Sequence, residues 1–204
     1  MAENQYEHFL EERALRVATL REQISGIIAN FPKSDAGDVF LTLEIGCGHG
    51  HFLSAYAKEF TNELCIGLDL ISKRIACANR KKMLGKIQNV FFFKAEAEEL
   101  LEALPDCIIL KKIFILFPDP WPKKRHFKNR LTRGEILDTL AKRASKDSLL
   151  HFRSDHKDFF DWSAEQFTEN TNWEILPDAI WPFEKESYFQ AMMGEYNSLI
   201  AKKV

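Results

Sequence analysis

The amino-acid sequence predicts an α/β fold built around a doubly wound, mostly parallel sheet. The first observation behind this prediction is that short apolar runs alternate with helical stretches along most of the chain. The second is that each run is almost continuously apolar in its middle, as expected for strands that are buried on both faces of a parallel sheet. Strands that alternate with helices in this way are typical of doubly wound proteins.

The first element is expected to be an amphipathic helix over residues 6–29. Apolar side chains recur there at three- and four-residue spacing and so share one helical face: Phe9, Leu10, Ala14, Val17, Leu20, Ile24, Ile27 and Ile28. Residues 30–37 are rich in helix-breaking types and form a linker. We therefore expect an N-terminal amphipathic helix and linker at residues 1–36 and a single domain at residues 37–204.

Strands and helices then follow in turn. The expected strands are residues 39–45, 64–70, 90–93, 111–117 and 148–153, and the helices are residues 52–58, 72–84, 97–104 and 134–146. A further helix is expected after Asp155 to about residue 170, and residues 173–176 and 196–201 could form final strands. The carboxyl ends of parallel strands meet at one edge of the sheet, and open α/β sheets bind their ligands at that edge.

Composition and charge exclude several classes of protein. The 204 residues carry 28 Lys and Arg against 30 Asp and Glu, and the net charge of -2 argues against a surface that is positive all over. No apolar stretch approaches the ~20 residues that span a bilayer, and the N-terminus lacks a secretory signal, so we expect a cytoplasmic protein without membrane contact. The cysteines form no C-x-x-C pair, and we predict no metal site.

The end of the first strand carries the most informative motif. Glu44-Ile45-Gly46-Cys47-Gly48-His49-Gly50 places glycines at alternate positions immediately before a helix, where the backbone can turn sharply and approach a ligand. A dinucleotide site would need a small residue where His51 stands, which disfavours an NAD-dependent oxidoreductase. The pattern E-x-G-x-G-x-G instead resembles the first motif of class I S-adenosylmethionine-dependent methyltransferases, which implies a sheet of the Rossmann-like type.

Carboxylates at the next strand ends fit the same cofactor. Asp69 ends the second strand, where a carboxylate can take both ribose hydroxyls, and Glu96 follows the third, where it could bond the adenine amino group. By the resemblance, Glu44 would meet the ammonium group of the methionine moiety. We therefore predict an S-adenosyl-L-methionine site that also includes Gly46, Gly48 and Gly50.

A rigid corner and a basic loop follow the fourth strand. Pro118 and Pro120 flank Asp119 and fix the backbone on both sides, and Trp121 comes next. Residues 120–134 contain no carboxylate but carry Lys123, Lys124, Arg125, Lys128, Arg130 and Arg133. A charge run alone is often only a solvated surface. Beside a cofactor motif and a rigid corner, however, it predicts methyl transfer to a nucleic acid.

The corner and the loop closely resemble the signature of bacterial tRNA (guanine-N7-)-methyltransferases. The matching residues are Phe117-Pro118-Asp119-Pro120-Trp121-Pro122-Lys123-Lys124-Arg125-His126, with Lys128, Arg130 and Leu131, and the resemblance extends over about residues 40–200. It implies transfer of a methyl group from S-adenosylmethionine to N7 of a guanine in the tRNA variable loop. It also implies that Asp119 is the catalytic residue and a cofactor-binding position.

The resemblance assigns the substrate contacts as well. Lys123 and Asp155 correspond to substrate-binding positions, and so does the late element Ser187-Tyr188-Phe189-Gln190, in which Gln190 replaces a carboxylate of the family. The remaining basic side chains of the loop are expected to bind tRNA phosphates: Lys124, Arg125, Lys128 and Arg130.

Two other interpretations stay open at this point. Pro118-Asp119-Pro120-Trp121 is also similar to the N/D-P-P-Y/F/W corner of methyltransferases that act on exocyclic amines, although the residue order differs. The second is a weakly active RNA-binding protein that retains the fold, because Gln190 lacks the charge of the family's residue.

Overall fold

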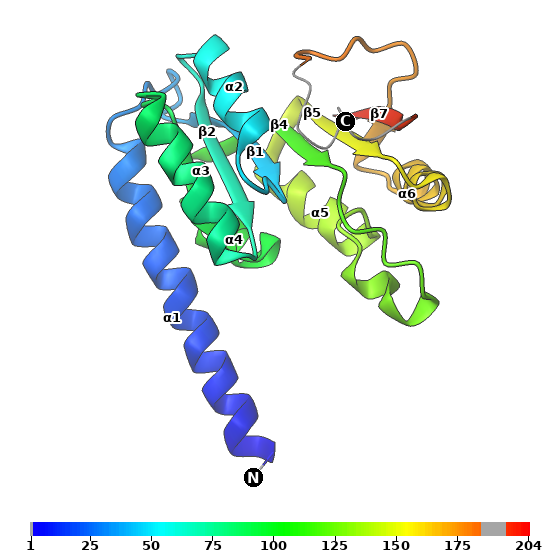
Figure 1. Ribbon diagram of the computed structural model, residues 1–204, viewed down its shortest axis with the longest axis horizontal. Coiled ribbons are helices and arrows are strands. Elements are labelled where there is room, and N and C mark those ends of the chain that lie inside the picture. The colour runs from blue at the N-terminus through cyan, green and yellow to red at the C-terminus, as the bar shows by residue number, and fades with distance from the viewer. Residues whose placement is uncertain (1, 185–194) are drawn as a thin grey trace.

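The structure is a computed structural model that describes residues 2–184 and 195–204, and its centre is one twisted sheet (Figure 1). The strands lie in the order β3-β2-β1-β4-β5-β7-β6. Their bounds are β1 Val39–Ile45, β2 Leu64–Asp69, β3 Val90–Lys94, β4 Ile108–Leu116, β5 Ala144–Ser154, β6 Trp173–Ile175 and β7 Asn197–Lys203. The pairs from β3 to β5 are parallel, and β7 pairs antiparallel with both β5 and β6. The predicted α/β fold with a mostly parallel sheet is confirmed.

Helices cover both faces of this sheet. They are α1 Ala2–Ile28, α2 His51–Glu59, α3 Ser72–Leu84, α4 Ala97–Ala103, α5 Gly134–Arg143 and α6 Lys157–Glu169, with the short 3-10 helix η1 Lys124–Asn129 between β4 and α5. α2 and α3 share one apolar core with Phe92 and Phe114 of the sheet. α1, α4, α5 and α6 share the larger core on the other face. No helix within the described ranges combines the length and apolarity that crossing a membrane requires.

The predicted N-terminal helix forms, but only its second half packs against the sheet domain. Val17, Leu20 and Ile24 are buried, whereas Phe9 and Leu10 are 53% and 44% exposed. The N-terminal part of the predicted apolar face is therefore left uncovered, and this part of α1 extends away from the other elements (Figure 1). Ion pairs from α1 to α4, Arg13–Glu102 and Arg16–Glu99, mark where the packing begins.

Several element boundaries differ from the expectation by up to four residues, and two of them concern the strands that flank the candidate site. The helix expected at residues 134–146 ends at Arg143, because Ala144 already pairs with Leu110 at the start of β5. β4 begins at Ile108 rather than at residue 111, because Ile108 pairs with Val39 on the neighbouring strand. Neither difference moves the carboxyl ends of the strands, where the candidate site residues were expected.

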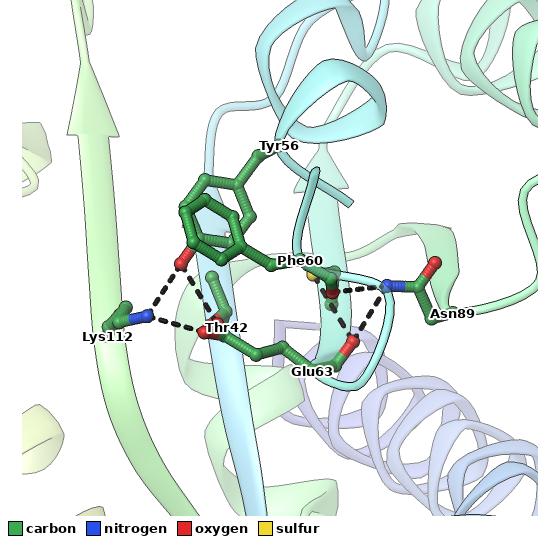
Figure 2. Close-up of polar contacts among 7 residues, drawn as sticks. Thr42, Tyr56, Phe60, Glu63, Asn89 and Lys112 are labelled. Carbon is green, nitrogen blue, oxygen red and sulfur yellow. Dashed lines mark hydrogen bonds and ion pairs between the residues drawn. The ribbon is translucent and has the colours of Figure 1, made fainter. Parts of the chain in front are cut away.

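A polar network lies near the amino ends of the strands (Figure 2). Lys112 of β4 donates to Oε1 of Glu63 at 2.6 Å and to the hydroxyl of Tyr56 at 2.7 Å. Oε2 of Glu63 accepts from the hydroxyls of Thr42 and Tyr56, at 2.8 and 2.9 Å. The side-chain amide of Asn89 donates to the backbone carbonyl of Ala57 in α2 and to those of Phe60 and Glu63 in the loop that follows. The network ties β1, β4 and α2 together at the edge opposite the candidate site.

Candidate active site

A cleft of about 440 Å³ opens at the carboxyl ends of the parallel strands. Four of the residues predicted to bind the cofactor line it: Gly46, Asp69, Glu96 and Asp119. They come from the end of β2 and from the segments that follow β1, β3 and β4, so the sheet brings together residues that are far apart in sequence. This is the edge at which open α/β sheets bind ligands.

The turn after β1 has the geometry that its glycines predict. Gly46, Gly48 and Gly50 have φ angles of 79°, 54° and 68°, in the left-handed region that side chains disfavour. A Cβ at Gly46 or Gly48 would meet nothing within 4 Å, so these two positions leave free space beside the backbone. A Cβ at Gly50 would lie 2.7 Å from that of Ala78, so packing as well as ligand approach accounts for this glycine.

Glu44, two residues before Gly46, is buried with an unpartnered carboxyl oxygen. The residue is 3% exposed, and its Oε2 has no hydrogen-bond partner among the described residues. Burial raises the pKa of Glu44 to about 8, and a hydrogen bond from the backbone N–H of Leu53 opposes part of that rise. A buried carboxylate oxygen without a partner costs free energy that a cationic ligand group would recover. The site therefore fits the ammonium group of S-adenosylmethionine.

Asp69 also fits a ribose site, but it has a second task that the sequence did not reveal. Its Oδ2 accepts from the N–H of Gly48 at 3.1 Å and its Oδ1 from the N–H of Ile71 at 2.8 Å. Arg74 of α3 approaches the same Oδ2 at 3.4 Å and lines the cleft. Asp69 therefore fixes the glycine turn, and its remaining lone pairs are available for a ligand.

In the corner after β4, the side chain of Asp119 is exposed to solvent. Phe117 and Trp121 have φ angles of 51° and 45°, an uncommon conformation for aromatic residues and one that clusters at functional sites. Arg130 stabilises the corner, because its Nε donates a hydrogen bond to the backbone carbonyl of Pro120 at 3.0 Å. The side chain of Asp119 is exposed at the cleft, between the cofactor residues and the basic loop.

Arg130 is not available for the phosphate contact that was predicted for it. It is 3% exposed, and its guanidinium lies 3.5 Å from the ring centroid of Phe127 and 4.5 Å from that of Trp162. Its structural role is to hold the loop against α6, so the phosphate assignment is wrong for this residue. Lys124, Arg125 and Lys128, in contrast, are exposed on η1.

Two of the predicted substrate residues, Lys123 and Asp155, lie within the described part of the chain. Lys123 is exposed directly before η1, and Asp155 is exposed directly after β5. Arg153, which the sequence did not single out, is buried under Trp181 and pairs with Glu184. The late element Ser187, Tyr188, Phe189 and Gln190 lies outside the described residues.

Comparisons with known proteins agree with this geometry. Residues 38–203 match the family described as "Putative methyltransferase". A tRNA (guanine-N(7)-)-methyltransferase of Mesoplasma florum is 31% identical over 79% of this chain and 80% of its own length. That of Mycoplasma capricolum is 31% identical over 84% of this chain and 82% of its own length.

A solved structure supports the fold alone. A 16S rRNA (adenine(1408)-N(1))-methyltransferase from Catenulisporales acidiphilia, with cosubstrate SAM, superposes with a TM-score of 0.58 at 14% identity. The match covers 90% of this chain and 91% of that one. The arrangement of strands and helices is therefore that of class I methyltransferases.

Proposed function

The chain belongs to the tRNA (guanine-N(7)-)-methyltransferase family, and we propose that Asp119, at the mouth of its cofactor cleft, is the catalytic residue. The protein is an enzyme that uses S-adenosylmethionine to methylate N7 of a guanine in tRNA. The observation that carries the residue assignment is the position of Asp119, which is exposed between the cofactor residues and the basic loop. The target is a guanine of the variable loop.

The cofactor is held by groups at three successive strand ends. S-adenosylmethionine supplies a methyl group on a sulfonium sulfur, which makes that methyl electrophilic. Glu44 would bind the ammonium group, Asp69 would accept from the ribose hydroxyls, and Glu96 would accept from the adenine amino group. The glycine turn gives these contacts room, because no side chain stands at Gly46 or Gly48.

Asp119 acts on the guanine rather than as an obligatory base. N7 of guanine carries an in-plane lone pair, so no proton has to leave before the bond to carbon forms. The main requirement is alignment of N7 with the methyl group and the departing sulfur, and fixed geometry supplies much of the acceleration. The carboxylate of Asp119 accepts from the N–H edge of the base and balances the positive charge of the methylated purine.

The loop after β4 holds the RNA. Lys124, Arg125 and Lys128 bind phosphates, while Lys123 and Asp155 contact the substrate nucleotide. Guanine N7 in the variable loop lies in or near the folded tRNA core, so local opening of the RNA is required, as in base extrusion. Residues 37–204 carry all these groups as one methyltransferase domain, with residues 1–36 as an appended helix and linker.

The assignment of Asp119 is tested by Asp119→Asn. Asparagine keeps the size and part of the hydrogen bonding but removes the charge, so single-turnover methylation of an unmodified tRNA transcript should slow by at least ~10²-fold. The unfolding temperature should change little, and calorimetric affinity for S-adenosylmethionine, measured in parallel, separates weaker cofactor binding from a slower rate at saturating cofactor. Asp35→Asn, in the exposed linker, is the matched control and should keep the wild-type rate.

Identification of the product separates this reaction from methylation of an amine. Nucleoside analysis should give 7-methylguanosine, and the wild-type rate should lack a steep dependence on a base that ionises near neutrality. An N-methylated exocyclic amine would refute the proposed reaction. A near-wild-type Asp119→Asn rate with 7-methylguanosine as product would refute only the role of this residue.

A further inference from the structure

A second cleft lies on the far side of η1 from the cofactor cleft. It has a volume of about 480 Å³ and is bounded by the basic loop on one side and α6 on the other. Lys128 and Asn129 of η1 line the cofactor cleft, whereas Lys124 and Phe127 of the same short helix line the second one. The short helix η1 therefore separates the two clefts and contributes side chains to both.

Part of the second cleft is aromatic and cationic. Phe127 and Trp162 contribute their rings, whose centroids are 5.6 Å apart, and the guanidinium of Arg130 packs against both. Arg130 is buried, yet its Nη1 has no hydrogen-bond partner among the described residues. A buried polar atom without a partner is uncommon in native proteins, so this donor is an unexplained cationic group in the wall of the cleft.

The other side of the cleft is acidic. Asp158, Asp161 and Glu165 stand at three- and four-residue spacing on α6 and share the face that lines the cleft. Carboxylates beside a basic loop weaken its attraction for phosphates, so phosphate binding does not account for them. Carboxylate oxygens do accept hydrogen bonds from the N–H groups of nucleobases.

We propose that this second cleft binds another nucleotide of the tRNA, next to the one that is methylated. Its base stacks on the rings of Phe127 and Trp162, which the buried Arg130 holds in place, and its N–H edge donates to Asp158 and Asp161. Lys124, at the rim, binds the phosphate. Unpaired RNA bases are recognised through stacking on aromatic or guanidinium planes combined with bonds to their edges. The proposal rests on the proposed function, because it takes tRNA as the substrate.

The test is the direction in which tRNA affinity changes when two carboxylates of the cleft are neutralised. In Asp158→Asn/Asp161→Asn, two carboxylates next to a polyanion lose their charge. If the cleft holds a base, the affinity for an unmodified tRNA transcript should weaken about tenfold, the scale of one lost hydrogen bond to a charged group. If the acidic face is only solvated, the same change removes repulsion, and affinity should stay equal or increase. An equal or tighter affinity overturns the proposal.

Controls keep the outcome interpretable. Glu169→Gln neutralises an exposed carboxylate of α6 that does not line the cleft, and it should not weaken binding. Asp161 pairs with Lys157, so if the double variant lowers the unfolding temperature, Asp158→Asn alone must still weaken binding. Wild-type enzyme that forms no 7-methylguanosine would refute the proposed function. Normal wild-type activity with unimpaired variants would refute only the second cleft.

Discussion

At the scale of single residues, Glu44 illustrates how the fold prepares a site for a cation. Burial holds its pKa at about 8, so the carboxyl is mostly protonated at pH 7 in the free protein. An ammonium group placed beside its unpartnered oxygen favours the ionised form and lowers that pKa. Most of the charge of Glu44 therefore develops when a cationic ligand binds.

The change in the pKa of Glu44 predicts how many protons are released when the cofactor binds. Binding of S-adenosylmethionine at pH 7 should release close to one proton per cofactor, since the free carboxyl is protonated and the bound one is ionised. Calorimetric titration in buffers of different ionisation enthalpy measures this number. Glu44→Gln, which keeps an acceptor for the N–H of Leu53, should release none and bind more weakly. Equal proton release by both proteins would exclude Glu44 as the source.

The hydrogen bonds of Asp69 make its removal costly in two ways. Asp69→Ala deletes the acceptor of the ribose hydroxyls and also frees the N–H groups of Gly48 and Ile71 that shape the turn. The loss of one charged hydrogen bond costs about 1.5–3 kcal/mol, so cofactor affinity should fall at least tenfold to hundredfold. Calorimetry with Asp35→Ala as control provides the test, and an unchanged affinity would remove Asp69 from the site.

At the scale of elements, the loop after β4 divides its basic side chains between two tasks. Lys124 and Lys128 are exposed on η1, whereas Arg130 is buried against α6. A charge pattern cannot distinguish these roles, because the burial of Arg130 depends on Trp162, which is distant in sequence. The sequence therefore predicted a basic loop correctly but not which cation holds it in place.

The exposed cations should determine how tRNA binding responds to salt. Lys124→Met and Lys128→Met should each reduce the slope of log affinity against log salt by about 0.7–0.9 unit, the value for one lost phosphate contact. Arg130→Met should instead lower the unfolding temperature, because it removes the guanidinium from between the rings. Filter binding across salt concentrations checks the slopes, with Lys146→Met as an exposed control. A salt-independent affinity would mean that the loop does not bind phosphate.

Helix α1 shows a second limit of element-scale prediction. The apolar spacing of residues 6–29 correctly indicated a helix, because periodicity depends only on local sequence. It did not indicate where docking begins, because α4 covers only the second half of the helix, from Arg13 onward. The length of a partner element is not encoded in the periodicity of the helix itself.

At the scale of the whole molecule, the two edges of the sheet have different tasks. The candidate site residues lie together because the carboxyl ends of parallel strands meet at one edge of the sheet. Prediction of the strands from the sequence is therefore enough to predict that Gly46, Asp69 and Asp119 lie close to one another. The network around Lys112 at the opposite edge was not predicted. Its members come from different elements without a motif, and only the folded sheet brings them together (Figure 2).

That network should contribute stability without contributing activity. Burial raises the pKa of Glu63, but hydrogen bonds from Lys112, Thr42 and Tyr56 outweigh it and leave the pKa below its usual value. A carboxyl whose pKa is lower in the folded state stabilises the protein above its unfolded pKa, and this contribution is lost as pH falls through the lowered value. Part of the acid sensitivity of the fold should therefore originate at Glu63.

Lys112→Met tests this contribution most directly. The change leaves the carboxylate of Glu63 half-buried without its cation, so the free energy of unfolding at pH 7 should fall by about 2 kcal/mol. Lys111→Met, at the exposed neighbouring position of the same strand, should cost far less. Denaturant unfolding of Lys112→Met, Glu63→Gln and the double variant gives the coupling energy between the two side chains.

The pH dependence of those unfolding curves supplies the second half of the test. Between pH 5 and pH 3 the wild type should lose more stability than Glu63→Gln, because only the wild type must protonate this carboxylate. Methylation rates at 25 °C should stay at the wild-type level in both single variants, since neither residue lines the cofactor cleft. A coupling energy near zero, or a loss of activity at full folding, would contradict the separation of the two edges.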